Sequence, residues 1–343
     1  MKAVILEKHG PPDVLKYKDI ESPLCESDKI KIRVKSASIN HLDLWVRSGI
    51  PGMNFNLPMT MGSDGAGVIE EIGKDVKNYN IGDDVVIQPG IYDSNCKLSK
   101  RGDENFSPSY GILGETQNGV QSDYVCLDPM HVYKMPSSLS YTEISSMPLT
   151  FMTSYQMLFE RAQLLDSDIL LVYGGTSGVG SAAIQIAKDY GCRKIISTVG
   201  SSKKIKYVED LGADAVFIHD KKLYYNIKDY LGKDKVDIVF EHIGKKTWDT
   251  SIKLLNKGGK IVTCGATTGS NVDINLTHIF FKQLSILGST MSNIKSFESV
   301  LKKIEDGKYK PLIDSIFPIS EIVDAHIRIE NRENIGKVVL DLS

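Results

Sequence analysis

Three glycines in the middle of the chain are spaced as a turn that could bind a nucleotide phosphate. They follow the apolar run 169–173 directly, and this run is typical of a buried parallel strand. Apolar residues recur at helical spacing after the turn, so a helix should begin within it. Glycines let a backbone approach a pyrophosphate, and the first N–H groups of a helix can bind that group. The pattern predicts a nicotinamide dinucleotide site, although a turn that only connects strand and helix would look similar. The predicted site residues here are Gly175, Ser177, Gly178, Val179 and Gly180.

The segment after the next predicted strand, 194–199, indicates which nucleotide binds. NAD enzymes place an acidic side chain there, on the ribose 2′-hydroxyl. This chain has Gly200-Ser201-Ser202-Lys203-Lys204 and no acid. Hydroxyl groups and lysines suit the 2′-phosphate of NADP(H), although solvated lysines at a helix start would show the same pattern. The segment therefore favours NADP(H) over NAD(H). The residues predicted to contact the nucleotide here are Thr198, Gly200, Ser201 and Lys204.

Further short strands are predicted downstream, and helical stretches rich in lysine and glutamate separate them. The predicted strands cover 215–218, 236–241, 260–265 and 284–289. Alternating strands and helices are typical of a doubly wound parallel sheet, and dinucleotides bind at the carboxyl edge of such a sheet. The residues at the carboxyl ends of these strands therefore extend the predicted site. They are His242, Gly265, Ala266, Gly288 and Ser289.

The two ends of the chain have a different pattern from its middle. Many short strands separated by Gly and Pro turns precede residue 145, which predicts a mostly antiparallel β domain. A helix over 141–160 should lead into the α/β part. A helix near 296–305 and a strand over 337–342 follow that part, and the last strand is expected to rejoin the first domain's sheet. We therefore expect one discontinuous domain, 1–147 with 292–343, and a second domain, 148–291.

Several ordered motifs give the chain a resemblance to the medium-chain dehydrogenase/reductase family. It is most similar to the branch that holds quinone oxidoreductases and related alcohol dehydrogenases. The motifs include Asn40-His41-Leu42-Asp43, Met61-Gly62-Ser63-Asp64-Gly65, Leu211-Gly212-Ala213-Asp214, Lys257-Gly258-Gly259-Lys260 and Gly336-Lys337-Val338-Val339. The resemblance implies an α/β fold class, with a GroES-like, mostly β catalytic domain plus a Rossmann-type doubly wound parallel sheet that binds NAD(P)(H). It also places Lys204 at a phosphate-contacting position of the zinc-free reductases, with His219 in an adjacent pocket.

The zinc-dependent members that this chain resembles carry ligands that are replaced here. Asn40 stands at the cysteine position, Ser63 at the histidine position, and Leu149 near the third position. Zinc prefers thiolate and imidazole ligands, so we expect no zinc at this site. A weak metal site at Asp64 with His41 is the alternative. The structural zinc lobe of the family is reduced to one of its cysteines, Cys96, with Asp93, Ser99 and Ser107 at the other positions.

Without zinc, other groups must stabilise the negative charge that hydride transfer builds on a substrate oxygen. Asn40 is the first candidate donor and Ser63 the second. Asp64 would orient them or supply a proton through water, and His41 matches a family position near the cofactor pyrophosphate. Asn40 could instead only cap a helix that begins at Leu42. Lys337 could simply be a lysine at the end of a strand.

Conjugate hydride addition to a quinone or enone spreads the developing charge, so it depends less on a metal. The expected function is NADPH-dependent reduction of a quinone, an enone or a small carbonyl compound. One alternative is an alcohol dehydrogenase that oxidises small alcohols with NAD(P), and another is an NADPH-binding protein with little catalysis.

The composition is that of an ordinary globular protein, with 41% hydrophobic and 24% charged residues and a net charge of −2. It indicates no general attraction to nucleic acid or membranes. No targeting segment is visible, and five scattered cysteines without a C-x-x-C pair are typical of free thiols, so we expect a cytoplasmic protein. The apolar stretch 276–288 at the predicted sheet edge favours pairing of subunits, as a homodimer or homotetramer.

Overall fold

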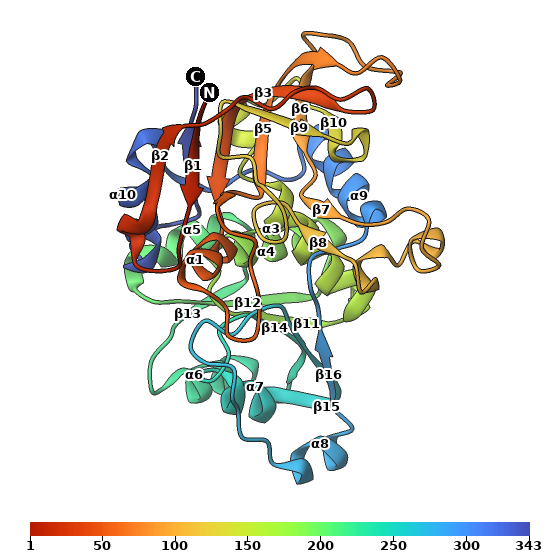
Figure 1. The fold of residues 1–343 in the computed structure, drawn as a ribbon. Helices are drawn as coiled ribbons and strands as arrows, with labels where there is room; N and C mark the ends of the chain where they lie inside the picture. Colours follow the sequence, from red (N-terminus) through yellow and green to blue (C-terminus); the bar gives the residue numbers. More distant parts are fainter. The chain divides into compact units, whose positions relative to one another are not determined.

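Residues 1–343 are described by the computed structural model, and they divide into two compact units (Figure 1). Unit 1 consists of Met1–Leu149 and Asn293–Ser343, and unit 2 consists of Thr150–Ser292. None of the helices has the length and apolar character needed to cross a membrane.

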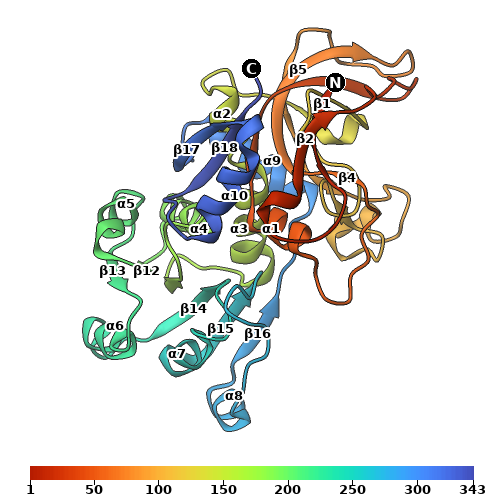
Figure 2. The same ribbon diagram turned by 60° about the vertical axis from the view of Figure 1, so that its left-hand side comes forward.

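The main element of unit 1 is a seven-stranded sheet in the order β10-β6-β5-β3-β18-β17, with β9 also paired to β3. The pairing is antiparallel throughout, except between β17 and β18, which lie next to each other in parallel (Figure 2). Pairing of β18 with β3 confirms that the last strand returns to the sheet of the first domain. The strands are β3 (Ile30–Ile39), β5 (Asp64–Ile72), β6 (Asp84–Ile87), β9 (Tyr124–Leu127), β10 (Val132–Lys134), β17 (Ile313–Pro318) and β18 (Lys337–Asp341).

Two small sheets and four helices complete unit 1. The helix α10 shows why they pack: Ile322, Ala325 and Ile329 recur at helical spacing and join the core around β3 and β18. The strands of the small sheets are β1 (Lys2–Leu6), β2 (Leu15–Asp19), β4 (Met59–Thr60), β7 (Gly90–Ile91) and β8 (Gly111–Ile112). The helices are α1 (His41–Ser48), α2 (Tyr141–Ile144), α9 (Ile294–Glu305) and α10 (Ile322–Glu330). Both β17 and α10 are additional to the elements predicted from the sequence.

The helix predicted over 141–160 is wrong as one continuous element. The structure has α2, then α3 (Pro148–Tyr155), then a π-helical turn over Gln156–Arg161. Proline has no N–H group and cannot continue a preceding helix, but it fits the first position of a new one. Pro148 therefore starts α3 and does not prolong α2.

Unit 2 contains a six-stranded sheet in the order β13-β12-β11-β14-β15-β16, and all its pairs are parallel. This confirms the predicted doubly wound sheet. Because β11 lies beside β14, the winding of the chain reverses between them, and ligands bind at such a reversal. The strands are β11 (Ile169–Val172), β12 (Lys194–Val199), β13 (Ala215–Ile218), β14 (Val236–Glu241), β15 (Leu255–Thr263) and β16 (Ser285–Gly288).

Short helices connect these strands, and one of them corrects a prediction. The apolar stretch 276–288 is not all sheet edge, because its first half forms α8 (Leu276–Lys282) and only β16 lies in the sheet. The Asn275 side chain caps α8 by accepting from the Thr277 N–H. The remaining helices are α4 (Gly178–Tyr190), α5 (Ile205–Asp210), α6 (Leu223–Leu231) and α7 (Trp248–Leu254).

Candidate active site

Strand pairing in unit 1 brings residues that are distant in the sequence to one place. β18 pairs with β3 so that Val338 lies opposite Ile39. β3 pairs with β5 so that Ser38 lies opposite Asp64. The end of β3 is therefore flanked by the first residue of β18 on one side and the first residue of β5 on the other.

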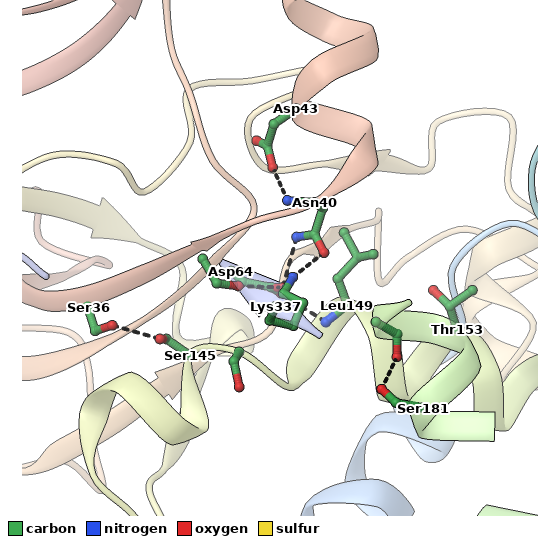
Figure 3. A network of polar contacts seen from close by, with 12 residues as sticks. Ser36, Asn40, Asp43, Asp64, Ser145, Leu149, Thr153, Ser181 and Lys337 are labelled. Atoms are coloured by element: carbon green, nitrogen blue, oxygen red, sulfur yellow. Dashed lines mark hydrogen bonds and ion pairs between the residues drawn. The ribbon is translucent and has the colours of Figure 1, made fainter. Parts of the chain in front are cut away.

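Three polar side chains occupy this position, and Figure 3 shows them pointing toward one another. Asn40 follows β3, Asp64 begins β5 and Lys337 begins β18. Their exposed fractions are 5%, 0% and 6%. Burying polar groups this deeply requires that they satisfy one another with hydrogen bonds.

Asp64 is the acceptor at the centre of the cluster. Its Oδ2 atom accepts from Asn40 Nδ2 at 2.9 Å, from Lys337 Nζ at 3.2 Å and from Ser38 Oγ at 3.3 Å. Its Oδ1 atom accepts from the backbone N–H of Leu149 at 2.9 Å. The ammonium group and the N–H donors replace the water that the Asp64 carboxylate loses on burial, so the fold can hold this charge in its interior.

Lys337 also donates to Asn40 Oδ1. Burial lowers the pKa of the Lys337 ammonium, and the negative charge of Asp64 acts in the opposite direction. The spacing of residues in the sequence did not indicate that this lysine belongs to the site. The feature that could have indicated it is a charged residue at the start of an apolar strand, Lys337-Val338-Val339-Leu340.

Asp43 lies one helical turn further along α1 and completes the polar surroundings. Its Oδ2 atom accepts from the Asn40 backbone N–H at 2.7 Å, while its Oδ1 atom has no partner. Burial raises the pKa of Asp43 to about 7. α1 begins at His41, one residue before the predicted start, and Asn40 precedes it directly. The Asn40 carboxamide binds Asp64 and Lys337, so it does more than cap this helix.

The other two predicted catalytic residues lie in different environments. Ser63 precedes Asp64, is fully buried, and its hydroxyl has no hydrogen-bond partner. His41 is exposed on α1, with its ring 5.9 Å from that of Trp45. The structure therefore places Ser63 next to the cluster in the chain and places His41 on the surface.

These residues do not fit a zinc site. The Asn40 and Asp64 oxygens accept from the Lys337 ammonium, and Leu149 has no ligand atom to offer. A tetrahedral zinc site needs thiolates, imidazoles or carboxylates that face the metal. No group of three or more His, Cys, Asp or Glu side chains in the chain is placed to hold a metal ion.

The lobe around Cys96 also lacks a zinc ligand set. The Cys96 thiol lies 3.1 Å from Ser99 Oγ and 3.7 Å from Ser107 Oγ. Hydrogen bonds, those from Ser99 above all, lower the pKa of Cys96. One thiol with two hydroxyl groups is a poor site for zinc.

The glycine turn of unit 2 has the geometry of an anion site at the start of α4. Ser177 caps the helix by accepting from the Gly180 N–H at 3.0 Å. The first N–H groups of a helix, those of Gly178 and Val179 here, have no partner inside the helix. A Cβ at Gly175 would lie 2.3 Å from Ser197 Oγ, and one at Gly180 would lie 2.3 Å from the Gly174 carbonyl oxygen. Glycine is therefore required at both positions by close packing.

Residues at the ends of β12 and β14 surround this turn. The Thr198 hydroxyl accepts from the Gly174 N–H at 3.2 Å, and the His242 ring lies 2.8 Å from the Tyr173 carbonyl oxygen. Burial lowers the pKa of His242 and that of His219, which lies just after β13. Gly200 has open space where a side chain would stand.

The remaining predicted contacts lie at the ends of β15 and β16. The Gly265 carbonyl oxygen accepts from Thr263 Oγ1 at 3.2 Å, and that of Ala266 accepts from the Gly269 N–H at 2.9 Å. The Gly288 carbonyl oxygen accepts from Arg161 Nε at 2.8 Å. The Ser289 N–H donates to the Thr263 carbonyl oxygen, and the Ser289 hydroxyl has no hydrogen-bond partner. All these positions lie at the carboxyl ends of parallel strands, the edge at which sheets of this type bind dinucleotides.

Comparisons with known proteins agree with both units. Residues 26–137 match an alcohol dehydrogenase GroES-like domain, and residues 178–306 match a zinc-binding dehydrogenase domain. The quinone oxidoreductase of Homo sapiens is 30% identical over 349 residues, which cover 99% of this chain and 97% of that protein. The crotonyl-CoA carboxylase/reductase of Cereibacter sphaeroides is 29% identical, and the match covers 97% of this chain and 84% of that protein.

A solved structure described as an NAD-dependent alcohol dehydrogenase has a TM-score of 0.96 and 35% identity, and the match covers 100% of both chains. These similarities extend over the full length and include both domain types. The chain belongs to the medium-chain dehydrogenase/reductase family and is an NAD(P)-dependent oxidoreductase.

Proposed function

We propose that the protein reduces a quinone, an enone or a small carbonyl compound with NADPH, and that zinc takes no part. The observation that carries this proposal is the buried cluster of Asn40, Asp64 and Lys337. Asn40 stands at a zinc-ligand position of the zinc-dependent relatives, and its oxygen accepts a hydrogen bond from an ammonium group. A site built in this way has a cation of its own and no ligand set for a metal.

The nicotinamide nucleotide, when bound, supplies the hydride. The chain must then stabilise the negative charge that develops on the substrate oxygen. The Asn40 amide can donate an N–H to that oxygen. The Ser63 hydroxyl is buried without a partner, and such a group is ready to donate to a ligand or a water.

An activated double bond matches these donors better than an isolated carbonyl does. Conjugation distributes the charge over several atoms, so neutral N–H and O–H donors can stabilise it without a metal. The 30% identity to a quinone oxidoreductase supports the same substrate class.

The end of β12 supports NADPH as the nucleotide. The segment 197–204 contains no acid that would bind a ribose 2′-hydroxyl or repel a 2′-phosphate. Gly200 leaves open space, and Ser201 and Lys204 follow it with a hydroxyl and an ammonium group. These groups are suited to a phosphate ester.

Oxidation of small alcohols is the second candidate function. The 35% identity to an NAD-dependent alcohol dehydrogenase structure favours it. The two functions are separated by steady-state assays of one preparation. NADPH oxidation with quinones, enones and aldehydes is measured in one arm, and NAD(P)⁺ reduction with primary and secondary alcohols in the other. Faster turnover with the quinones and enones supports the proposed reduction. Faster turnover with the alcohols would make alcohol oxidation the function of the protein. Tight NADPH binding without turnover in either arm would favour a binding protein.

We also propose that the protein forms a homodimer or homotetramer through β16. This strand pairs with β15 on one side and is the last strand of the sheet. Phe280, Phe281 and Leu276 of the preceding helix are exposed. An uncovered strand edge beside apolar side chains favours self-association. Light scattering of the wild type and of Phe281→Lys tests this: the variant should have the lower mass, and equal masses would contradict the proposal.

A further inference from the structure

The Asn40 side-chain amide is held in a defined orientation by the chemistry of its two partners. Lys337 carries only hydrogen-bond donors on Nζ, and the Asp64 carboxylate carries only acceptors. The amide oxygen must therefore face Lys337, and the amide nitrogen must face Asp64, from which it is 2.9 Å away. The reversed amide would place two donors against each other and two acceptors against each other.

This orientation leaves one N–H of Asn40 without a partner. The Nδ2 group has two hydrogens, and the structure gives it one acceptor, Asp64 Oδ2. Asn40 is 5% exposed as a residue, so bulk water reaches very little of it. A nearly buried donor with a remaining hydrogen is available to a substrate atom.

Lys337 acts on this donor from the opposite end of the amide. A cation at Oδ1 draws electron density from the amide and makes its N–H groups stronger donors. Its own charge is balanced by Asp64, so the cluster holds a cation beside Asn40 without leaving a buried charge unpaired.

We propose that Lys337 is a positioning residue, which orients and polarises the Asn40 amide so that the remaining N–H donates to the substrate oxygen. This inference rests on the proposed function, because it assigns the oxyanion donor of that reaction. It differs from a purely structural role, in which Lys337 only neutralises the buried Asp64.

Two variants separate these roles. Lys337→Met removes the cation and keeps a side chain of similar length, but it leaves the Asp64 charge unpaired. The double variant Lys337→Met with Asp64→Asn removes both charges together, so it restores an uncharged cluster. Neither variant restores a cation at Asn40 Oδ1. Lys337→Arg is the charge-conserving comparison, and Lys31→Met, on β3 of the same sheet, is the matched control.

The measurements are thermal stability, kcat for the quinone or enone, and KM for NADPH. We expect Lys337→Met to lower kcat by about 10- to 100-fold, as expected for weakening one donor to an oxyanion. KM for NADPH should stay within twofold, and Lys31→Met should match the wild type. The double variant should regain stability without regaining kcat, and Lys337→Arg should retain more activity than either. Recovery of kcat in the double variant, or an unchanged kcat in Lys337→Met, would overturn the inference.

A readout that does not need turnover keeps the inference separate from the proposed function. Selective ¹⁵N labelling of asparagine reports the Asn40 side-chain amide, whose signals are identified by their loss in Asn40→Leu. We expect these signals to move in the Lys337→Met variant and in the double variant, and to stay in place in Lys31→Met. If the wild type turns over none of the acceptors, the proposed function fails and this spectrum alone decides the inference. Unmoved signals in Lys337→Met, where the Asp64 acceptor of Asn40 Nδ2 is kept, would refute it.

Discussion

The Nζ atom of Lys337 lies 3.2 Å from the Oδ2 atom of Asp64, although 273 positions separate the two residues in the chain. Both groups are buried, and Asn40 lies between them in the hydrogen-bond network. The ends of β3, β5 and β18 therefore provide an ion pair and an amide, and the positive charge beside Asn40 is part of the polypeptide.

Replacing Asn40 by leucine should lower kcat and leave nucleotide binding intact. The variant removes the proposed N–H donor, and removal of one oxyanion donor reduces kcat by about 10²- to 10³-fold in well-studied enzymes. The rate of NADPH oxidation with a quinone or enone measures the effect. Asn256→Leu, at an exposed asparagine of unit 2, is the control and should match the wild type. Equal kcat values for the two variants would remove Asn40 from the reaction.

Replacing Lys204 by glutamate should weaken NADPH binding selectively. A carboxylate near the 2′-phosphate repels it, whereas NADH has no charge at that position. We expect KM for NADPH to rise about tenfold or more, which corresponds to 1.4 kcal/mol or more, while KM for NADH changes little. Lys206→Glu, two residues further along on an exposed side chain, is the matched control. A parallel rise for both nucleotides would argue against the assigned 2′-phosphate contact.

His326 should make the folded state less stable in acid. Burial, assisted by the charge of Arg47, lowers its pKa from 6.5 to about 3. Between these values the unfolded chain binds a proton that the folded chain excludes, so stability falls as the pH is lowered through this window. The His326→Asn variant has no imidazole, so its stability does not show this loss at low pH. The stability advantage of the wild type over the variant should therefore shrink by roughly 3 kcal/mol between pH 7 and about pH 4.5.

Urea unfolding of both proteins at several pH values measures this difference. Asp43 changes the stability of the folded state in the opposite direction. Its pKa is raised to about 7 in the folded protein, so the folded state becomes more stable as the pH falls below that value. Asp43 is present in both proteins, so its effect cancels in the comparison. A pH-independent difference between wild type and variant would show that the pKa of His326 is the same in the folded protein as in the unfolded chain.

Cys96 should be the cysteine that reacts first with an alkylating reagent near neutral pH. Hydrogen bonds from Ser99 lower its pKa, and thiolates are the reactive form. Burial raises the pKa of Cys126 and Cys192 to about 11 and that of Cys264 to about 12, so these thiols stay protonated. Peptide mapping after brief iodoacetamide treatment should find the label on Cys96, and Cys96→Ser should lose the fast phase. Earlier labelling of Cys192 or Cys264 would contradict this order.

Much of unit 2 could be predicted because its central strands β11, β12 and β14 are buried on both faces. Apolar runs then indicate most strands of the sheet within one or two residues, as for Lys194–Val199. β15 begins at Leu255, earlier than predicted. The next residues, Asn256, Lys257 and Gly258, are exposed and not apolar, so no apolar run indicated this part of the strand. β17 has a half-exposed pattern without a clear apolar face, so its residues resemble a loop.

The candidate site was only partly predictable for a different reason. The motifs around Asn40 and Asp64 lie within single segments, and each can be identified there. Lys337 comes close to them only through two strand pairings, β18 with β3 and β3 with β5. The register of such a pairing depends on both strands, so neither segment alone predicts which residues meet. A lysine at a strand end is usually solvated, so burial of this one had to come from the tertiary structure.

The most direct test of a zinc-free site is turnover measured together with metal content. The protein is purified without chelator or histidine tag, zinc per chain is quantified, and NADPH oxidation with a quinone or enone is followed before and after dialysis against a chelator. We predict far less than one zinc per chain and an unchanged rate after dialysis. One zinc per chain, with a rate that falls on chelation and returns when zinc is added, would contradict the account.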